Sequence, residues 1–498
     1  MAIQASRSFN LVREPWIPIA GRDRVSLAEL FASTSLPALG GNAIEKISLL
    51  KLALAVAQTA ATPEDDAEWA KSGFRGIGER SCSYLEDHVD DFWLRSDRPF
   101  LQVPAIAEAE QISLGAAQPM IAAGNSTIFF ESQIERDYSD PEIAVLLVTL
   151  MNFALGGKKT DNTVVLSKGY MGKTKENGKP RTGTSGPSLG FLGYLHNFLL
   201  GRSVLETVWL NLLTKTDIEG MAFFGKGLGR PIWERMPGGE DDEIARISRD
   251  SYLGRLLPLS RFVLLAGEGL HYSGGITYPS HKEGAQDVSI AVTSDSDRKA
   301  LWTDPDKRPW RQLPSLLAFF KSQSENDFDC RLLRVAIPRA AKAGAPFRIW
   351  SGGLRVSSNA GEQYVSGRDD FLESEIELDP NWLGEAWFQR LKLEMDALED
   401  QGKGLFRSVL AYGAALKADT AGHAAKATEG FWSDCESIFQ ELVTSCGDGE
   451  GARREALRKR IARIAEAKYD ETCPRDSARQ FEAWAEHRIS TSRYTALP

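Results

Sequence analysis

The stretch ELDP, residues 377–380, divides the sequence into two parts of different character. From Asn381 to the end, the pattern is helical only. FWSDCESIFQELV (431–443) and EALRKRIARIAEAKY (455–469) each gather apolar residues on one stripe, and the back of the second is heavily charged. CGDG (446–449) and CPRDS (473–477) are breaks typical of connections between antiparallel helices. We therefore expect a C-terminal four-helix bundle over residues 379–498.

Before ELDP, helical and strand-like patterns are mixed. The helical segments are NAIEKISLLKLALAVAQTAA (42–61), IAVLLVTLMNFAL (143–155) and LGYLHNFLLGRSVLETVWLNLLT (192–214). The strand-like segments are RFVLLAG (261–267), DVSIAVTS (287–294), LLRVAIP (332–338) and FRIWSGGLRVSS (347–358). The predicted fold class is α+β: a large, irregular, mixed α/β N-terminal domain (1–378) followed by the four-helix bundle.

Length and composition restrict the class of protein. A chain of 498 residues with 42% hydrophobic and 26% charged residues is globular and long enough for two or three domains. The five cysteines form no CxxC pair, so we expect no disulfide framework and a reducing, cytoplasmic location. We see no signal peptide, and the longest apolar run is shorter than the ~20 residues of a typical membrane span. No membrane partner is expected.

One segment is basic although the chain has a net charge of -9. It is LSKGYMGKTKENGKPRTGTSGPSLG, residues 166–190. It carries five basic residues against the single acid Glu176, with glycines between them. Lys158 and Lys159 stand shortly before it. Glycine allows the backbone to approach a groove closely, and a local basic patch can bind phosphate even in an acidic protein. On the pattern alone, a solvated loop and a phosphate-contacting loop remain equally open.

The residues give no positive case for catalysis. VVLSKGYMGKT (164–174) resembles a phosphate loop, but Ser167 occupies the position of its first glycine, and Pro180 disfavours the helix that should follow. The six histidines show no HxH, HD or HExxH spacing, and His196 is interpreted as a satisfied core or interface group. We expect no enzyme activity, no cofactor and no metal. The alternatives are a P-loop-like NTPase and an RNA-associated scaffold protein that uses the same basic loop.

Several short segments resemble the CasA family, the large subunit of the type I-E CRISPR surveillance complex, Cascade. They are FNLVREPWIPI (9–19), SDRPFLQV (96–103), FRIWSGGLRVSSNAGEQY (347–364) with RDD (368–370) after it, and the C-terminal helices. Residues 156–310 align poorly. Some family members carry a cysteine cluster suited to zinc in this middle part, and this chain has none.

The resemblance implies a binding role in antiviral defence. Such a subunit recognises the protospacer-adjacent motif (PAM) in double-stranded target DNA and starts strand separation. It also stabilises the R-loop and recruits the helicase–nuclease. The implied partners are the guide RNA, the other Cascade subunits, target DNA and that nuclease. Guided recognition divides the work in this way, because protein reads the short motif while base pairing reads the sequence.

The resemblance also implies functional loops. A glycine loop over the minor groove matches Gly156, Gly157, Lys158 and Lys159, and the basic segment adds Lys168 and Lys173. A basic finger matches Arg298 or Lys299. A wedge that opens the duplex matches Arg355, Val356, Ser357, Ser358 and Asn359, after a turn expected at Gly352 and Gly353. A loop near the guide RNA 5′ end, where target DNA comes in, matches Phe129, Phe130 and Glu131.

Overall fold

The computed structural model describes most of the chain and divides it into two compact units. The described residues are 7–119, 136–153, 160–177, 179, 193–279, 286–320, 327–356, 371–447 and 449–496. The mixed unit comprises residues 1–309 and 324–375, and the helical unit comprises 310–323 and 376–498. The division at 375/376 lies close to the boundary expected at 378/379, but it assigns 310–323 to the helices. The two-domain assignment itself stays a prediction.

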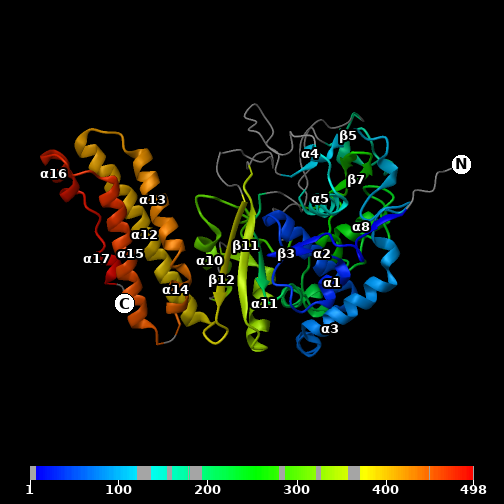
Figure 1. Ribbon diagram of the computed structural model, residues 1–498, viewed down its shortest axis with the longest axis horizontal. Coiled ribbons are helices and arrows are strands. Elements are labelled where there is room, and N and C mark those ends of the chain that lie inside the picture. Colours follow the sequence, from blue (N-terminus) through cyan, green and yellow to red (C-terminus); the bar gives the residue numbers. More distant parts are fainter. Residues whose placement is uncertain are drawn as a thin grey trace. The chain divides into compact units, whose positions relative to one another are not determined.

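A buried helix, α2 (Ala43–Ala61), lies at the centre of the mixed unit (Figure 1). Its start follows from a capping box, because the Asn42 side chain accepts a hydrogen bond from the Glu45 N–H while the Glu45 side chain accepts one from the Asn42 N–H. Helices α3 (Asp66–Asp87), α5 (Asp140–Asn152) and α9 (Tyr252–Leu256) pack against α2. Packing on several sides explains why its apolar residues do not form a single stripe.

Small antiparallel sheets complete the mixed unit. Among the described residues, two three-stranded sheets have the orders β12-β11-β6 and β5-β8-β7, and three further sheets have two strands each. In the first sheet, β11 runs antiparallel to β6 with Arg348 opposite Leu200 and Gly352 opposite His196. The strands are β1 (Ser8–Asn10), β2 (Ile17–Ile19), β3 (Arg22–Val25), β4 (Trp93–Arg95), β5 (Gln111–Ser113), β6 (His196–Leu200), β7 (Arg261–Ala266), β8 (Gly269–Gly274), β9 (Ala291–Thr293), β10 (Phe328–Cys330), β11 (Phe347–Leu354) and β12 (Phe371–Leu378).

The predicted helix over 192–214 is wrong in its first half. Residues His196–Leu200 form strand β6, and a helix, α6 (Val204–Leu210), begins only after the Ser203 cap. The short apolar run HNFLL fits a buried strand as well as a helix. Its pairing with β11 decides the outcome. His196 is buried, as the core interpretation predicted, and its Nδ1 lies 2.9 Å from Ser289 Oγ.

The predicted strand over 332–338 is also wrong, because Arg331–Lys342 forms helix α11 despite Pro338 inside it. The buried residues Leu332, Leu333, Ala336, Ile337 and Ala340 recur at helical spacing on one face. Burial of this face outweighs the backbone hydrogen bond that proline removes. The other short helices of the mixed unit are α1 (Leu27–Ala32), α4 (Leu114–Ala117), α7 (Lys215–Glu219) and α8 (Glu243–Arg249).

The part after the boundary is helical, as predicted (Figure 1). The helices α12, α13 and α15 pack pairwise, α16 packs on α12, and α14 and α17 pack on α15. A short helix from the 310–323 segment, α10, also contacts α12. The bounds are α10 (Leu313–Leu316), α12 (Glu385–Leu416), α13 (Ala421–Glu436), α14 (Phe439–Ser445), α15 (Gly451–Thr472), α16 (Ala478–Glu486) and α17 (Ser492–Thr495).

An ion pair is buried inside the helical unit. Glu394 of α12 accepts hydrogen bonds from Arg458 of α15, with Arg458 Nε 2.9 Å from Oε1 and 3.1 Å from Oε2. Arg454, one turn earlier on α15, lies 3.4 Å from the same carboxylate. The exposed fractions of the Glu394 and Arg458 side chains are 1% and 3%, so this charge pair is part of the core. Within the described residues, no helix has both the length and the apolar character needed to cross a bilayer.

Candidate nucleic-acid interface

The basic segment contains two turns that expose lysines. Ser167–Tyr170 forms a turn closed by a hydrogen bond of 3.0 Å from the Tyr170 N–H to the Ser167 carbonyl. Gly169 has a φ of +78°, which glycine adopts without strain, and Lys168 is exposed beside it. In the second turn, the Lys175 N–H donates to the Lys179 carbonyl at 2.8 Å, and both lysines are exposed. We call Lys168, Lys175 and Lys179 the turn lysines.

Lys173 lies between these turns but points inward. Its side chain is 1% exposed, and its Nζ donates to Glu240 Oε1 at 2.7 Å, the Val164 carbonyl at 2.7 Å and Ser273 Oγ at 2.6 Å. These three acceptors use all three N–H donors of a lysine. The expectation that Lys173 contacts DNA is therefore corrected, because its ammonium is buried and fully hydrogen-bonded.

Glu240 is the partner that holds this ammonium. Its carboxylate also accepts from the backbone N–H of Leu166 at 3.0 Å and of Ser167 at 2.7 Å. Burial alone would raise the pKa of Glu240, but the hydrogen bonds from Lys173 and the two N–H groups outweigh burial and hold that pKa below its ordinary value. The Glu240 carboxylate is thus a buried anion that is hydrogen-bonded by the Lys173 ammonium and by two backbone N–H groups.

This geometry argues against the phosphate-loop alternative. A phosphate-loop lysine has to reach the β- and γ-phosphates of a nucleotide, whereas Lys173 is buried against Glu240. We expect no ATP turnover by the purified chain, with or without magnesium. A phosphate-release assay checks this expectation, and turnover that disappears in Lys173→Met would contradict it.

The hairpin of the proposed basic finger and the base of the proposed wedge are both close to one group of residues, Tyr194, Trp302 and Thr303, which we call the aromatic rim. The rings of Tyr194 and Trp302 are 5.0 Å apart, and Thr303 N–H donates to the Gly193 carbonyl at 2.8 Å. Just before Trp302 in the chain, β9 and the residues after it form a hairpin in which the Thr293 N–H donates to the Lys299 carbonyl at 2.9 Å.

Arg298 and Lys299 lie in this hairpin, and the side chain of Lys299 is 66% exposed. The end of β11 also lies against the aromatic rim. A Cβ at Gly353 would overlap Thr303 Oγ1 and lie 2.7 Å from the Tyr194 carbonyl oxygen. The structure therefore brings the candidate finger and the strand that leads into the candidate wedge to the same rim.

The prediction of a turn at Gly352 and Gly353 is wrong. Both residues lie within strand β11, and neither has a positive φ. They are glycines for a different reason, which is close packing: a Cβ at Gly352 would come 2.6 Å from the Trp350 ring and 2.9 Å from the Leu372 carbonyl oxygen. Val356 is half-buried and packs close to Gly193, since a Cβ at Gly193 would come 2.4 Å from Val356 Cγ2.

Arg355 is also half-buried. The remaining candidates lie outside the described residues. They are Phe129, Phe130, Glu131, Gly156, Gly157, Lys158, Lys159, Ser357, Ser358 and Asn359. Their proposed roles stay predictions.

A buried polar network contacts β6, the strand that begins two residues after Tyr194 of the aromatic rim. Lys51 of α2 forms an ion pair with Asp287, and Asp287 Oδ1 accepts from the Ser289 N–H at 2.9 Å. Ser289 in turn contacts His196 of β6. Among the described residues, no three His, Cys, Asp or Glu side chains gather as metal ligands would. The expectations of no metal and no cofactor stay predictions.

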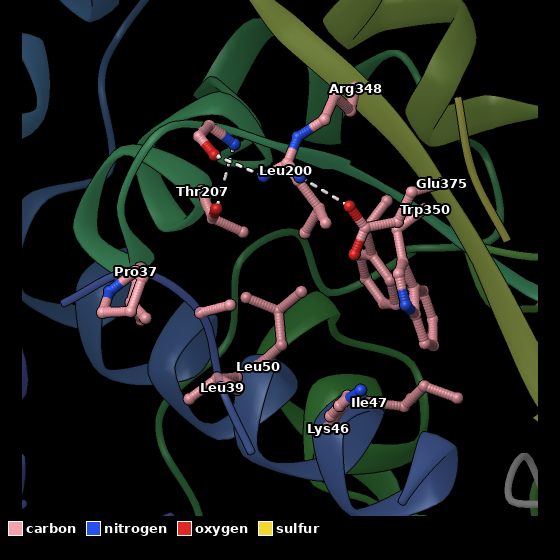
Figure 2. Close-up of a pocket in the computed structure, with 14 residues that line it drawn as sticks. Pro37, Leu39, Lys46, Ile47, Leu50, Leu200, Thr207, Arg348, Trp350 and Glu375 are labelled. Carbon is pink, nitrogen blue, oxygen red and sulfur yellow. Dashed lines mark hydrogen bonds and ion pairs between the residues drawn. The ribbon is translucent and has the colours of Figure 1, made fainter. Parts of the chain in front are cut away.

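An apolar pocket lies at the other end of the β6–β11 pair (Figure 2). Its lining includes Leu39 and Leu50, and its edge carries Arg348, which donates to Glu375 at 2.6 Å and to the Gly201 carbonyl at 3.3 Å. The register separates this pocket from the aromatic rim, since Leu200 pairs with Arg348 while His196 pairs with Gly352. The pocket suits an apolar group, and its charged groups are already paired.

Sequence reasoning missed Glu240, Tyr194 and Trp302. A single glutamate in GGEDDE carries no pattern that distinguishes a buried carboxylate from its solvated neighbours. The aromatic pair comes from segments that are far apart in the chain. Gly193 and Gly239, which directly precede Tyr194 and Glu240 in the chain, were the available signal, because both leave room for close approach.

The fold is that of a CRISPR-associated protein. Thermobifida fusca Cse1 has a TM-score of 0.78 at 20% identity, covering 99% of both chains. A chain of a solved CRISPR RNA-guided surveillance complex has a TM-score of 0.68 at 15% identity, covering 97% of this chain and 99% of that one. At these identities the likeness concerns the fold.

The chain belongs to the CRISPR-associated protein Cse1 family, whose model matches residues 10–467. A curated relative, the CRISPR-associated protein CasA/Cse1 of Thermus thermophilus, is 28% identical over 247 residues. That match spans 46% of this chain and only 42% of the relative. The family assignment confirms the resemblance seen in the sequence, and the fold class is confirmed as well.

Proposed function

We propose that this chain is the large subunit of a Cascade-type, RNA-guided surveillance complex. In this role it recognises the PAM in duplex DNA and starts strand separation beside it. It then helps to stabilise the R-loop and recruits the helicase–nuclease. The chain itself performs no chemistry and needs no cofactor. Its partners are the guide RNA, the other complex subunits, target DNA and the nuclease. Motif recognition and strand opening belong to residues 1–378.

One observation carries this proposal: exposed cations and the base of the candidate wedge occur on a hydrogen-bonded turn, a hairpin and a strand of the mixed unit. Lys168 projects from a turn that is hydrogen-bonded to the protein interior, and Lys299 projects from a hairpin at the aromatic rim. Fixed cations can contact the phosphate backbone without first being ordered, and such contacts set the position of a protein on the duplex. Family membership and the likeness to a chain of a surveillance complex support the same role.

The class of protein is tested by tagging the chain in its own cell and identifying what co-purifies. We expect a guide RNA of uniform length together with the other subunits of the complex. Purification without RNA or partner subunits would contradict the proposal. Tight RNA binding by the isolated chain, with no CRISPR subunits present, would instead support the RNA-associated scaffold.

Replacing the three turn lysines by alanine is expected to weaken duplex binding and to reduce its salt dependence. Each lysine that neutralises a phosphate releases counterions, so the slope of log K against log[salt] should fall by roughly 0.9 for each phosphate that is no longer neutralised. The weakening should be the same on all DNA sequences, because phosphate contacts carry no sequence information. Fluorescence anisotropy of labelled duplexes over a salt series measures both quantities.

A matched control comes from three exposed lysines elsewhere in the mixed unit: Lys71, Lys226 and Lys342. Their triple alanine variant changes the net charge by the same amount, so it separates local contact from the overall charge of the protein. We expect the control to leave the salt slope nearly unchanged. Equal slopes for the two triple variants would show that the turn lysines are only solvated.

A further inference from the structure

The Ser167–Tyr170 turn is hydrogen-bonded to the loop that carries Glu240. The loop that carries Glu240 reaches the turn at two further points besides the carboxylate. The Asp241 N–H donates to Ser167 Oγ at 2.8 Å, and Gly239 lies so close that a Cβ there would come 3.0 Å from the Ser167 nitrogen. At the other end of the turn, Tyr170 OH lies 2.5 Å from Thr277 Oγ1. Each end of the turn therefore has its own attachment.

Lys173 connects the same carboxylate to the sheet. Its bond to Ser273 joins the segment to β8, and its Nζ lies 5.7 Å from the centre of the Phe262 ring on β7. Gly274 leaves the space through which this side chain passes, since a Cβ there would come 3.1 Å from Lys173 Cε. Glu240 thus links its own loop to two other parts of the fold. It contacts strand β8 through Lys173, and it accepts hydrogen bonds from the Leu166 and Ser167 N–H groups at the start of the turn.

We propose that Glu240, together with Lys173, is a positioning residue for duplex binding: the buried pair fixes the turn that presents Lys168 to the phosphate backbone. This inference rests on the proposed function. Glu240 makes no contact with DNA in this scheme. It acts because the turn holds the Lys168 ammonium where it can neutralise a phosphate. A lysine on a loose glycine-rich loop has to lose conformational entropy to reach a phosphate, so it stays in solvent and releases no counterion.

The sequence of the segment fits a scheme in which Lys173 holds the turn and Lys168 contacts the phosphate. A lysine in a glycine-rich loop is ordinarily a solvated cation, yet Lys173 is the one that the fold buries, while Lys168 remains exposed. Glu240→Gln keeps the size of the side chain but removes its charge, so the Lys173 ammonium and the N–H groups of Leu166 and Ser167 lose their common anion. The turn should then sample many conformations, and Lys168 should lose its fixed position.

The test is a double-mutant cycle between Glu240 and Lys168 in the full chain within the assembled complex. The variants are Lys168→Ala, Glu240→Gln and the pair together, and the measured quantity is the salt slope of duplex binding. We expect Lys168→Ala to lower the slope by about 1. Glu240→Gln should lower it by at least as much, and the double variant should show no further fall. A residue with a merely structural role would not produce this non-additivity.

Glu394→Gln provides the matched control, because it removes a buried carboxylate that contacts arginines in the helical unit. Its effect should be additive with Lys168→Ala. If Glu240→Gln does not yield folded protein, Ser167→Ala takes its place in the cycle, since it removes only the hydroxyl that accepts from Asp241. The criterion of non-additivity is unchanged.

The possible results separate this inference from the proposed function. Additive effects of Glu240→Gln and Lys168→Ala would overturn the positioning role and leave the phosphate contact intact. An unchanged slope for Lys168→Ala alone would overturn the phosphate contact, and with it the inference. A non-additive fall in the slope that is absent in the Glu394→Gln control supports both.

Discussion

Glu394→Ala is expected to lower the free energy of unfolding of the helical unit by about 3–5 kcal/mol, the range for removing one partner of a buried ion pair. Alanine leaves the Arg458 guanidinium, whose side chain is only 3% exposed, without its carboxylate. Arg454 lies beside it at 15% exposure, so two cations then face each other in the core. Both the missing hydrogen bonds and this repulsion destabilise the folded state.

Urea unfolding followed by far-ultraviolet circular dichroism measures this effect, since helices dominate the signal. The control is Glu455→Ala on the same helix as Arg458, which breaks an exposed ion pair with Lys459 at 2.5 Å. Exposed pairs contribute little because water already solvates both charges. We expect the Glu455→Ala midpoint to stay nearly unchanged. Similar midpoints for the two variants would mean that the buried pair contributes no more than a surface pair.

A second variant tests whether the destabilisation comes from the unpaired charge. Replacing Glu394 and Arg458 together by leucine removes both ions and keeps apolar volume in the core. Replacing a buried ion pair by packed apolar residues is often neutral or stabilising. The double variant should therefore recover much of the stability that Glu394→Ala removes. Failure to recover it would point to packing, rather than charge, as the cause.

The sequence predicted the elements that have strong local signals. Helix α2 follows from its long apolar run, and the helical character after residue 380 follows from apolar stripes between clear breaks. These signals are local, since a stripe can be recognised within a few helical turns. The errors occur where the deciding interaction is distant. His196–Leu200 is a strand because it pairs with β11, which lies far along the chain.

The candidate site shows the same limit. The sequence marked 166–190 as basic and glycine-rich, but it offered no means to tell Lys173 from Lys168. The difference comes from Glu240, whose carboxylate reaches Lys173 only after the chain has folded. Likewise, the sequence attributed Gly352 and Gly353 to a turn, whereas the structure shows close packing within a strand as the reason for these glycines. Glycine serves both turns and close packing, and only the neighbouring Trp350 and Thr303 distinguish them.

Replacing Ser357, Ser358 and Asn359 by glycine is expected to slow strand opening on linear duplex by up to about tenfold. Opening the first base pair costs on the order of one stacking step, ~1.4 kcal/mol, which corresponds to a factor of about ten. Polar side chains that hydrogen-bond the exposed base edges can offset a cost of this size, and glycine offers no such groups. Val356 is left unchanged because it is half-buried at the aromatic rim and supports the chain that leads to these residues.

The DNA substrate provides the internal control for this wedge prediction. The variant should bind the PAM duplex almost as tightly as the parent, because the basic groups on the turns and the hairpin are unchanged. The defect should shrink on negatively supercoiled DNA and on duplex with a mismatch beside the motif, since both lower the cost of opening. Stopped-flow fluorescence of a base analogue next to the motif measures the opening rate. A normal rate on linear duplex would remove residues 357–359 from the wedge. A defect of equal size on mismatched duplex would assign their effect to binding, because a wedge that only opens base pairs has no further advantage once the first pair is already open.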